Sequence, residues 1–353
     1  MTPPTHFQQD ISRQTTELRK VLGLLTGASE PAVRQAADLV RQAQHVFLIG
    51  IGASWHAALG TGVLFNQRGR PAFTIEAAEL LHFTAIPPNS VIIAISRTGR
   101  SIEIVQLLAK ARQAEASVIG ITNSNESPLA QEASVAIVVP VKLDYAISVN
   151  TYSTLVLAAA VLACCEDSDF RESCSAFMNS LVLLETSLPT WGAEISVSSW
   201  LRAPATYYFL ARGPSLASGF QARLLWEEGA KSPATAMNTS GFRHGPQEIV
   251  EPGMRFCIWI DPLAMRSQDM AVAEDLNKLG AEVALIGQGL PGNSAHLTFD
   301  IPPVPPSWQF VVDVIPMQLA AEALSRLRAV DCDSFRLCSY IVEDESGLLN
   351  KKG

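Results

Sequence analysis

The chain has 353 residues, of which 48% are hydrophobic and 17% are charged, so it holds enough apolar material for a large buried core. Its formal net charge is −8 with no block of basic residues, which argues against nucleic acid as a partner but allows a small anion in a local pocket. The six cysteines lack metal-ligand spacing, as expected for a reduced, cytoplasmic protein without a metal site. The first residues of the sequence lack the basic segment followed by an apolar segment that is typical of a signal peptide. The longest apolar run, residues 155–165, is too short to span a membrane.

Two helices are predicted first, and we expect them to serve packing or dimer contacts. Strands and helices then alternate, which predicts a parallel sheet with helices on both of its faces. The expected helices cover residues 7–24, 30–44, 53–65, 77–82, 101–114 and 150–166, and the strands cover 46–50, 72–76, 91–95, 118–122 and 135–139. A helical region with breaks, residues 168–202, leads into the second half.

The second half restarts the same pattern at an offset of about 161 residues. A tandem repeat of one α/β module is therefore predicted. The expected domains are N-terminal helices at 1–44, a phosphate-binding first module at 45–190, and a second module with a C-terminal tail at 191–353. The strands of the second module are expected at 207–211, 256–260 and 283–286, and its helices at 216–230 and 268–279.

Residues 91–101 combine five apolar residues with a cluster of hydroxyl groups, and they predict a buried strand, a tight loop and a helix start. A helix start presents unpaired N–H groups and the positive end of a dipole, so it attracts an anion. Ser96, Thr98 and Ser101 add hydroxyl donors, and Gly99 allows a close approach of the backbone. We interpret the loop as a phosphate cradle; the alternative is an ordinary loop whose hydroxyls cap the helix. It is not a Walker loop, because the Gly-Lys-Thr ending is absent.

A glycine-rich segment at residues 50–54 also follows a predicted strand. It resembles the start of a dinucleotide fingerprint, but Trp55 stands where the third glycine belongs, so no cofactor is expected. Ser54 is instead interpreted as a hydroxyl at the same ligand site. In the second half, Asp261 follows the strand equivalent to the one before the hydroxyl loop, so only the first repeat is expected to hold a phosphate. His244 stands among turn-forming residues.

Five short segments, in this order, resemble the motifs of the tandem sugar isomerase (SIS) domain family, over about residues 30–345. The resemblance implies two three-layer αβα modules of flavodoxin-like type. It extends to the isomerase half of glucosamine-6-phosphate synthase and to stand-alone phosphosugar isomerases, deaminases and deglycases. The segments are Gly52-Ala53-Ser54, Glu76-Ala77-Ala78-Glu79, Ser96-Arg97-Thr98-Gly99-Arg100-Ser101, Gly213-Pro214-Ser215 and His244-Gly245-Pro246.

The resemblance implies a role for each matching residue. Glu228 would move a proton between C1 and C2 of the sugar, since one carboxylate on one face can perform both steps. His244 would help to open the sugar ring, often from the partner subunit, which implies a homodimer. The alternative for Glu228 is that it is a solvent-exposed helix residue without a catalytic role. The alternative for His244 is that it only stabilises a turn. The phosphate set would be Ser54, Ser96, Arg97, Thr98 and Ser101, with Gly52 and Ala53 beside it.

The sequence departs from the synthase pattern at its lysines. Leu225 stands three residues before Glu228, where the synthase has a lysine, and Asn150 replaces another before the long helix. Asn150 and Lys231 remain candidate substrate contacts. The segment 333–340 also lacks the lysine that forms an imine with an open-chain sugar, so a mechanism through an enzyme imine is not expected.

The predicted function is a phosphosugar isomerase or an amino-sugar-phosphate deaminase or deglycase. Its substrate would be a hexose-6-phosphate or a similar molecule. No cysteine nucleophile stands near the start, so glutaminase activity is not expected. The alternative is a non-catalytic sensor of a sugar phosphate, and a dinucleotide oxidoreductase is a distant third.

Overall fold

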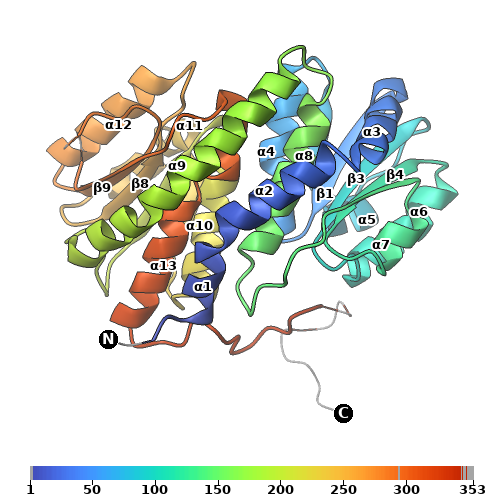
Figure 1. Ribbon diagram of the computed structural model, residues 1–353. Helices are drawn as coiled ribbons and strands as arrows, with labels where there is room; N and C mark the ends of the chain where they lie inside the picture. The colour runs from blue at the N-terminus through green and yellow to red at the C-terminus, as the bar shows by residue number, and fades with distance from the viewer. Residues whose placement is uncertain (1–2, 293–294, 343, 345–346, 348–353) are drawn as a thin grey trace. The chain divides into compact units, whose positions relative to one another are not determined.

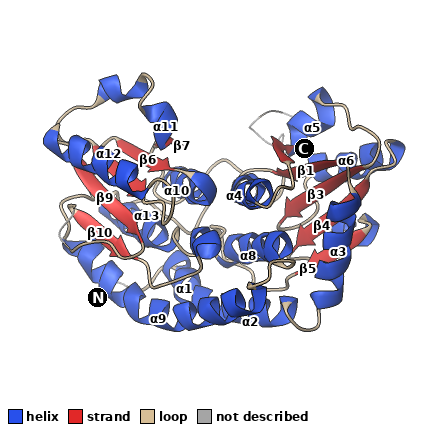
Figure 2. Ribbon diagram, turned by 90° about the horizontal axis from the view of Figure 1, so that it is seen from above, coloured by secondary structure: helices blue, strands red, loops and turns tan. Residues whose placement is uncertain are grey.

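The computed structural model describes residues 3–292, 295–342, 344 and 347, and it contains two five-stranded sheets (Figure 1). The paired strands within each sheet run parallel. Helices lie on both faces of each sheet (Figure 2). The predicted tandem α/β architecture is therefore confirmed.

The first sheet has the strand order β2-β1-β3-β4-β5, which is that of a flavodoxin-like doubly wound sheet. All five strands were predicted to within one residue at each end. They are β1 (His45–Gly50), β2 (Ala72–Glu76), β3 (Ser90–Ser96), β4 (Ser117–Thr122) and β5 (Val135–Val138). Its helices are α3 (Glu30–Gln42), α4 (Ala53–Gln67), α5 (Ala77–Phe83), α6 (Ile102–Gln113), α7 (Pro128–Glu132) and α8 (Asn150–Cys164).

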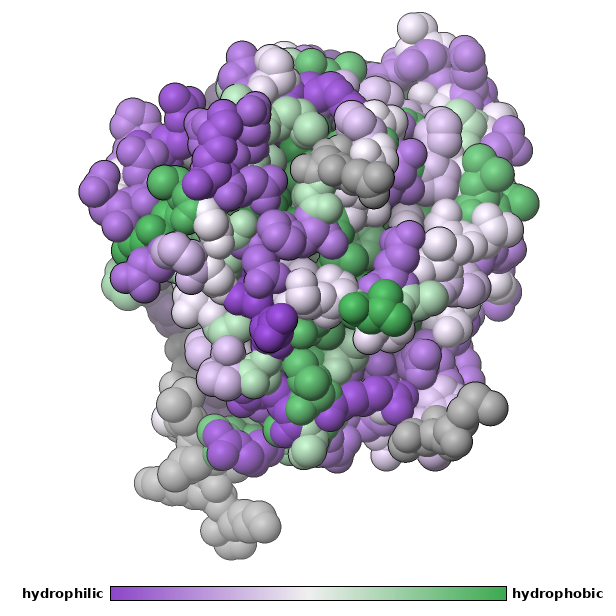
Figure 3. Space-filling model, turned by 90° about the vertical axis from the view of Figure 1, so that its left-hand side faces the viewer, coloured by the Kyte–Doolittle hydropathy of each residue, from purple (hydrophilic) through white to green (hydrophobic). Residues whose placement is uncertain are grey.

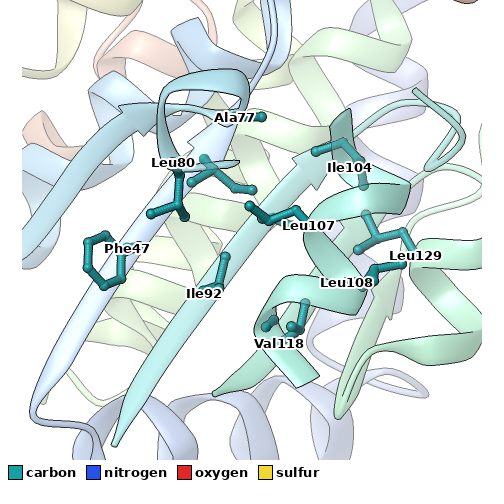
Figure 4. Close-up of a cluster of buried hydrophobic side chains, with 12 residues drawn as sticks. Phe47, Ala77, Leu80, Ile92, Ile104, Leu107, Leu108, Val118 and Leu129 are labelled. Carbon is teal, nitrogen blue, oxygen red and sulfur yellow. The ribbon is translucent and has the colours of Figure 1, made fainter. Parts of the chain in front are cut away.

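The core of this module forms because β1, β3 and β4 are almost continuously apolar, as expected for strands buried on both faces. On one face, Ile92 and Phe47 pack against Leu80 of α5 and Leu107 of α6 (Figure 4). Helix α8 is buried along its whole length and contacts α4. The buried sheet thus supports the loops at its carboxyl edge.

The second sheet has the order β10-β9-β8-β6-β7, which repeats the first when read from the other edge. Its two edge strands were not predicted, because four residues are too few for a clear alternation and β7 is only partly buried. The strands are β6 (Tyr207–Ala211), β7 (Thr235–Asn238), β8 (Arg255–Trp259), β9 (Glu282–Gly287) and β10 (Leu297–Asp300).

The helices around the second sheet include α13 (Ile315–Leu327), which the sequence analysis did not predict, although a proline in its first turn is typical of a helix start. The others are α10 (Leu216–Glu228), α11 (Thr239–Phe242), α12 (Arg266–Lys278) and the short 3₁₀ segments η1 (Gly213–Ser215), η2 (Pro246–Ile249) and η3 (Pro306–Val311).

The side of the molecule in Figure 3 is mainly hydrophilic, with small separate apolar areas.

Two helical predictions were wrong in detail. The single helix predicted at 7–24 is two helices, α1 (His6–Ser12) and α2 (Gln14–Leu25). The region predicted to be broken contains one 28-residue helix, α9 (Phe170–Val197), which continues through Pro189. In the parts of the chain that the structure describes, no helix combines the length and apolar character needed to cross a membrane.

Contacts divide the chain into two compact units, which are described separately below. Residues 16–171 and 334–353 form the first-sheet unit, and residues 1–15 and 172–333 form the second-sheet unit. Within the latter, Thr5 donates to Glu322 of α13 at 2.9 Å, and the Asp333 carboxylate accepts from the first N–H groups of α1. The domain boundaries expected from the sequence remain a prediction, because compactness does not test independent folding.

Candidate functional site

The hydroxyl-rich loop lies where the sequence pattern predicts, between the end of β3 and the start of α6. We call residues 96–101 the anion loop. Gly99 has a φ of +60°, and a Cβ there would lie 2.5 Å from Ser127 Oγ, so this position requires glycine. Since β1 and β3 are parallel neighbours, the loops after both strands share the carboxyl edge of the sheet, where α/β folds bind ligands.

The hydroxyl groups of the loop help to shape it. Ser96 Oγ accepts from the backbone N–H of Gly99 at 3.1 Å, and Thr98 Oγ1 accepts from that of Arg100 at 3.3 Å. Because both act as acceptors here, each keeps its own O–H as a donor. Ser101 is the N-cap residue of α6, and its side chain makes no capping bond. The loop therefore presents hydroxyl donors next to a helix N-terminus, as an anion site needs.

Arg97 connects three segments of the first-sheet unit. Its Nη1 donates to Ser148 Oγ at 2.9 Å, and its Nη2 donates to the Tyr340 carbonyl at 2.8 Å. The guanidinium carbon lies 3.9 Å from the centre of the Tyr340 ring, a cation–π contact. Sequence reasoning missed both partners. The hydroxyl-rich stretch at 141–154 was a signal for Ser148, but no local pattern links Arg97 to a tyrosine 243 residues away.

Gly52, Ala53 and Ser54 form the turn from β1 into α4. Gly52 is the N-cap residue with a φ of +52°, and Ser54 lies half-buried in the first turn of the helix. A Cβ on Gly50 would lie 2.4 Å from the Ser54 carbonyl carbon, so this turn is as tight as its glycines suggest. Ser54 thus lies at the same sheet edge as the anion loop.

Asn150 is the first residue of α8 and is fully buried. Its Nδ2 donates to Asp144 at 2.8 Å, and the same buried carboxylate accepts from the backbone N–H groups of Val149, Asn150 and Thr151. The Thr151 hydroxyl donates to it as well, at 2.7 Å. The N-terminus of α8 is therefore already occupied by an internal carboxylate, and the Asn150 amide nitrogen belongs to this cap.

The loop after β8 corresponds to the anion loop of the first sheet, and it contains a carboxylate. Asp261 Oδ2 accepts from the backbone N–H groups of Met265 at 2.8 Å and Leu263 at 3.3 Å, just before α12. Behind it, buried Asp269 accepts from Arg212 Nε at 2.5 Å, and burial raises the pKa of the Asp269 carboxyl despite this guanidinium. Asp261 therefore places a carboxylate in the loop of the second sheet, where the anion loop of the first sheet has hydroxyl groups.

The predicted base and histidine lie in the second-sheet unit. Glu228 is the last residue of α10 and is half-buried. Lys231 adopts a φ of +52° and donates from Nζ to the Glu228 carbonyl. His244 is exposed, and its backbone N–H donates to the Gly241 carbonyl at 3.0 Å. Gly245 follows with a φ of +124°, so the chain turns sharply after the histidine.

A groove of about 870 Å³ also lies in the second-sheet unit, between α1, α9 and α13. Leu188, Ile195, Leu319 and Leu327 are among its lining residues, and none of the predicted site residues is. It is therefore not part of the predicted chemistry.

Residues 39–163 match the family model described as "SIS domain". In Sulfolobus acidocaldarius, glutamine–fructose-6-phosphate aminotransferase is 26% identical over 215 residues, 61% of this chain and 36% of that protein. The arabinose 5-phosphate isomerase of Francisella tularensis is 33% identical over 172 residues, 44% of this chain and 53% of that protein. The alignments thus span between about a third and a half of these relatives.

The architecture also matches a solved structure over nearly the full length of both chains. The structure of glucosamine-6-phosphate deaminase from Thermotoga maritima superposes with a TM-score of 0.78 and 20% identity, and covers 96% of this chain and 99% of that one. At this identity the match establishes the fold alone. The matched family model and the shared fold confirm the resemblance indicated by the sequence motifs: residues 39–163 are similar to the SIS domain, and nearly the whole chain shares the fold of a solved SIS-type structure.

Proposed function

We propose that this protein converts a phosphosugar, as an aldose–ketose isomerase or as a deaminase or deglycase of an amino-sugar phosphate. The observation that carries the proposal is the contrast between the two modules. The first ends β3 in a loop with hydroxyl donors at a helix start, whereas Asp261 occupies the N–H groups of the equivalent loop. A site built for one phosphate group fits this asymmetry.

In the proposed complex, the phosphate binds the anion loop. Ser96, Thr98 and Ser101 donate from their hydroxyls, and the N-terminus of α6 contributes its backbone N–H groups and dipole. Ser54 adds a hydroxyl from the neighbouring turn. Relatives of the SIS type include proteins named for sugar phosphates, which supports a phosphosugar as the ligand.

The proposed transfer of a proton between two carbon atoms of the sugar needs one carboxylate. Glu228 removes the proton from the carbon beside the carbonyl, the C–H electron pair forms a carbon–carbon double bond, and the π electrons of the carbonyl move onto its oxygen. That oxygen takes up a proton to give the enediol or enolamine, and the hydroxyl or amino group on the neighbouring carbon gives one up when the new carbonyl or imine forms. The resulting carboxylic acid returns the proton to the neighbouring carbon. His244 exchanges a proton with the ring oxygen when the sugar ring opens, since an imidazole can both donate and accept a proton. In a deaminase, water then replaces the amine.

The test uses fructose-6-phosphate, glucosamine-6-phosphate and fructosamine-6-phosphate as substrates, with carbonyl interconversion and ammonia release as readouts. We expect Glu228→Gln to abolish turnover while thermal stabilisation by the sugar phosphate persists. Glu227→Gln is the matched control, because Glu227 is the exposed neighbour on the same helix and pairs only loosely with Arg223, at 3.9 Å. Turnover that survives Glu228→Gln contradicts the assigned base.

A sugar-phosphate sensor is the second candidate, and the Asn150 amide favours it. Asn150 stands where the synthase pattern has a lysine, and it is buried in the cap of α8. A site without that lysine fits a protein that binds a sugar phosphate without converting it. Stabilisation by the three sugar phosphates without turnover of any would support the sensor. Light scattering on the same samples tests the homodimer that we also propose.

A further inference from the structure

A C-terminal segment lies across the anion loop, far from it in sequence but within the same compact unit. We call residues 337–342 the strap. Two contacts connect its backbone to the loop and to the helix that follows: the Tyr340 carbonyl accepts from Arg97 at 2.8 Å, and the Val342 carbonyl accepts from the backbone N–H of Ile102, the first residue of α6, at 3.3 Å. A third contact is the Tyr340 ring, which stacks on the Arg97 guanidinium.

The second contact lies at the centre of the proposed phosphate site. Ile102 is the first residue of α6, so its N–H is one of the donors that no helical carbonyl can satisfy. A carbonyl oxygen at this N–H, close to the positive end of the helix dipole, takes the place that suits a phosphate oxygen. The uncharged Val342 carbonyl of the strap thus occupies the place where a phosphate oxygen would bind.

Arg97 holds the strap in this position. Its Nη1 is fixed by Ser148, so the guanidinium plane is set from one side while Nη2 and the ring face engage Tyr340. Two parallel interactions with one residue favour a single geometry, as the planar guanidinium allows. Arg97 therefore acts as a latch between the loop and the strap.

The strap is weakly buried, so it can open. Tyr340 is 37% exposed, Val342 48% and Leu337 59%. Opening it removes little apolar surface from contact, and a charged phosphate oxygen is a stronger acceptor than a carbonyl for the released N–H.

We propose that the strap is an autoinhibitory element, latched by Arg97 and Tyr340, which competes with the phosphate group of the ligand for the N-terminus of α6. The proposal rests on the phosphate site proposed above. A phosphate that binds there displaces the Val342 carbonyl, and the strap then leaves the loop.

The first experiment compares phosphate binding by the full chain and its Tyr340→Ala variant, by calorimetry with inorganic phosphate. Loss of the latch raises the fraction of open molecules, so we expect the dissociation constant to fall about threefold or more. Leu337→Ala is the matched control, because it removes a more exposed apolar side chain from the same strap. Equal or weaker binding by Tyr340→Ala overturns the proposal.

The second experiment follows backbone amide exchange of residues 337–342 with and without inorganic phosphate. Competition predicts faster exchange in the strap when phosphate is bound, because the ligand opens it. Slower exchange would mean that the strap closes over the ligand, and that result also overturns the proposal.

The two proposals fail in different ways. If wild type and Tyr340→Ala both fail to bind inorganic phosphate or glucosamine-6-phosphate, the proposed phosphate site is wrong. The proposal that the strap competes with phosphate is then wrong as well. If wild type binds phosphate, but Tyr340→Ala binds it no better and phosphate does not speed amide exchange in the strap, only the strap proposal fails.

Discussion

At the scale of single residues, Gly99 decides whether the anion loop can form. Replacing it with alanine places a side chain at φ +60°, which costs about 1 kcal/mol, and forces a Cβ to within 2.5 Å of Ser127 Oγ and 2.9 Å of Leu129 Cβ. Overpacking of this kind costs a further 1–3 kcal/mol, roughly. We expect Gly99→Ala to lower the free energy of unfolding by about 2–4 kcal/mol and to abolish stabilisation by phosphate, as measured by denaturant titration.

Gly289 provides the matched control for this prediction. Its φ is +59°, but a Cβ there would have nothing within 4 Å. Gly289→Ala should therefore show the backbone cost alone, about 1 kcal/mol, with phosphate stabilisation unchanged. Equal losses in the two variants would mean that contact with Ser127 and Leu129 does not matter.

At the scale of elements, the N-terminus of α8 depends on Asp144. This buried carboxylate accepts from three backbone N–H groups and two side chains at the start of a fully buried helix. Hydrogen bonds to a charged group contribute roughly 1.5–3 kcal/mol, so Asp144→Asn should lower the thermal midpoint by several degrees. Ser101→Ala is the control, because that N-cap side chain makes no capping bond and its loss should leave the midpoint nearly unchanged.

The elements themselves were largely predictable from the sequence. Strands β1, β3 and β4 are apolar runs bounded by turn residues, and this local signal identified them and the loops that follow. The N-terminal helix pair was read as one helix because its apolar spacing continues across Arg13. Asp144 could not be recognised as a cap, because several hydroxyl-bearing residues stand closer to that helix start and only the folded chain brings the carboxylate to it.

Contacts between distant parts of the sequence were the least predictable. Arg97 was assigned to the phosphate on the basis of its place in a motif, but its partners Ser148 and Tyr340 come from segments 51 and 243 residues away. No periodicity encodes such a pairing. Ser215 gives a second case: it was noted only as part of a motif, and nothing in the sequence indicated that its hydroxyl donates to buried Asp313, 98 residues away, at 2.6 Å.

At the scale of the whole molecule, Asp313 links the pH of the solution to stability. It is fully buried in the second-sheet unit, and burial raises the pKa of its carboxyl to about 7, although hydrogen bonds from Ser215, Ser218 and Gln309 lower it. The Trp259 indole donates to the Asp313 backbone carbonyl, and Cys257, the other titratable group close to it, is buried and carries a raised pKa itself. Among the residues that the structure describes, the carboxyl therefore has polar partners but no cation in contact with it.

The sign of the pH dependence follows from this pKa. In the unfolded chain the carboxyl titrates near pH 4, so between about pH 4 and pH 7 the folded protein holds a proton that the unfolded chain has released. Asp313 should thus lower the free energy of unfolding as pH rises through this window, by on the order of 4 kcal/mol. Denaturant titrations at pH 5, 6, 7 and 8 measure this slope, which should flatten above pH 7.

The variant Asp313→Asn isolates this contribution, because an amide keeps the shape of the side chain and does not titrate. We expect its free energy of unfolding to depend less on pH between 5 and 7 than that of wild type, with the two curves differing in slope rather than only in height. Ser218→Ala removes one donor to the carboxylate, so it should raise the pKa further and extend the slope above pH 7. Parallel curves for wild type and Asp313→Asn would show that other groups produce the pH dependence.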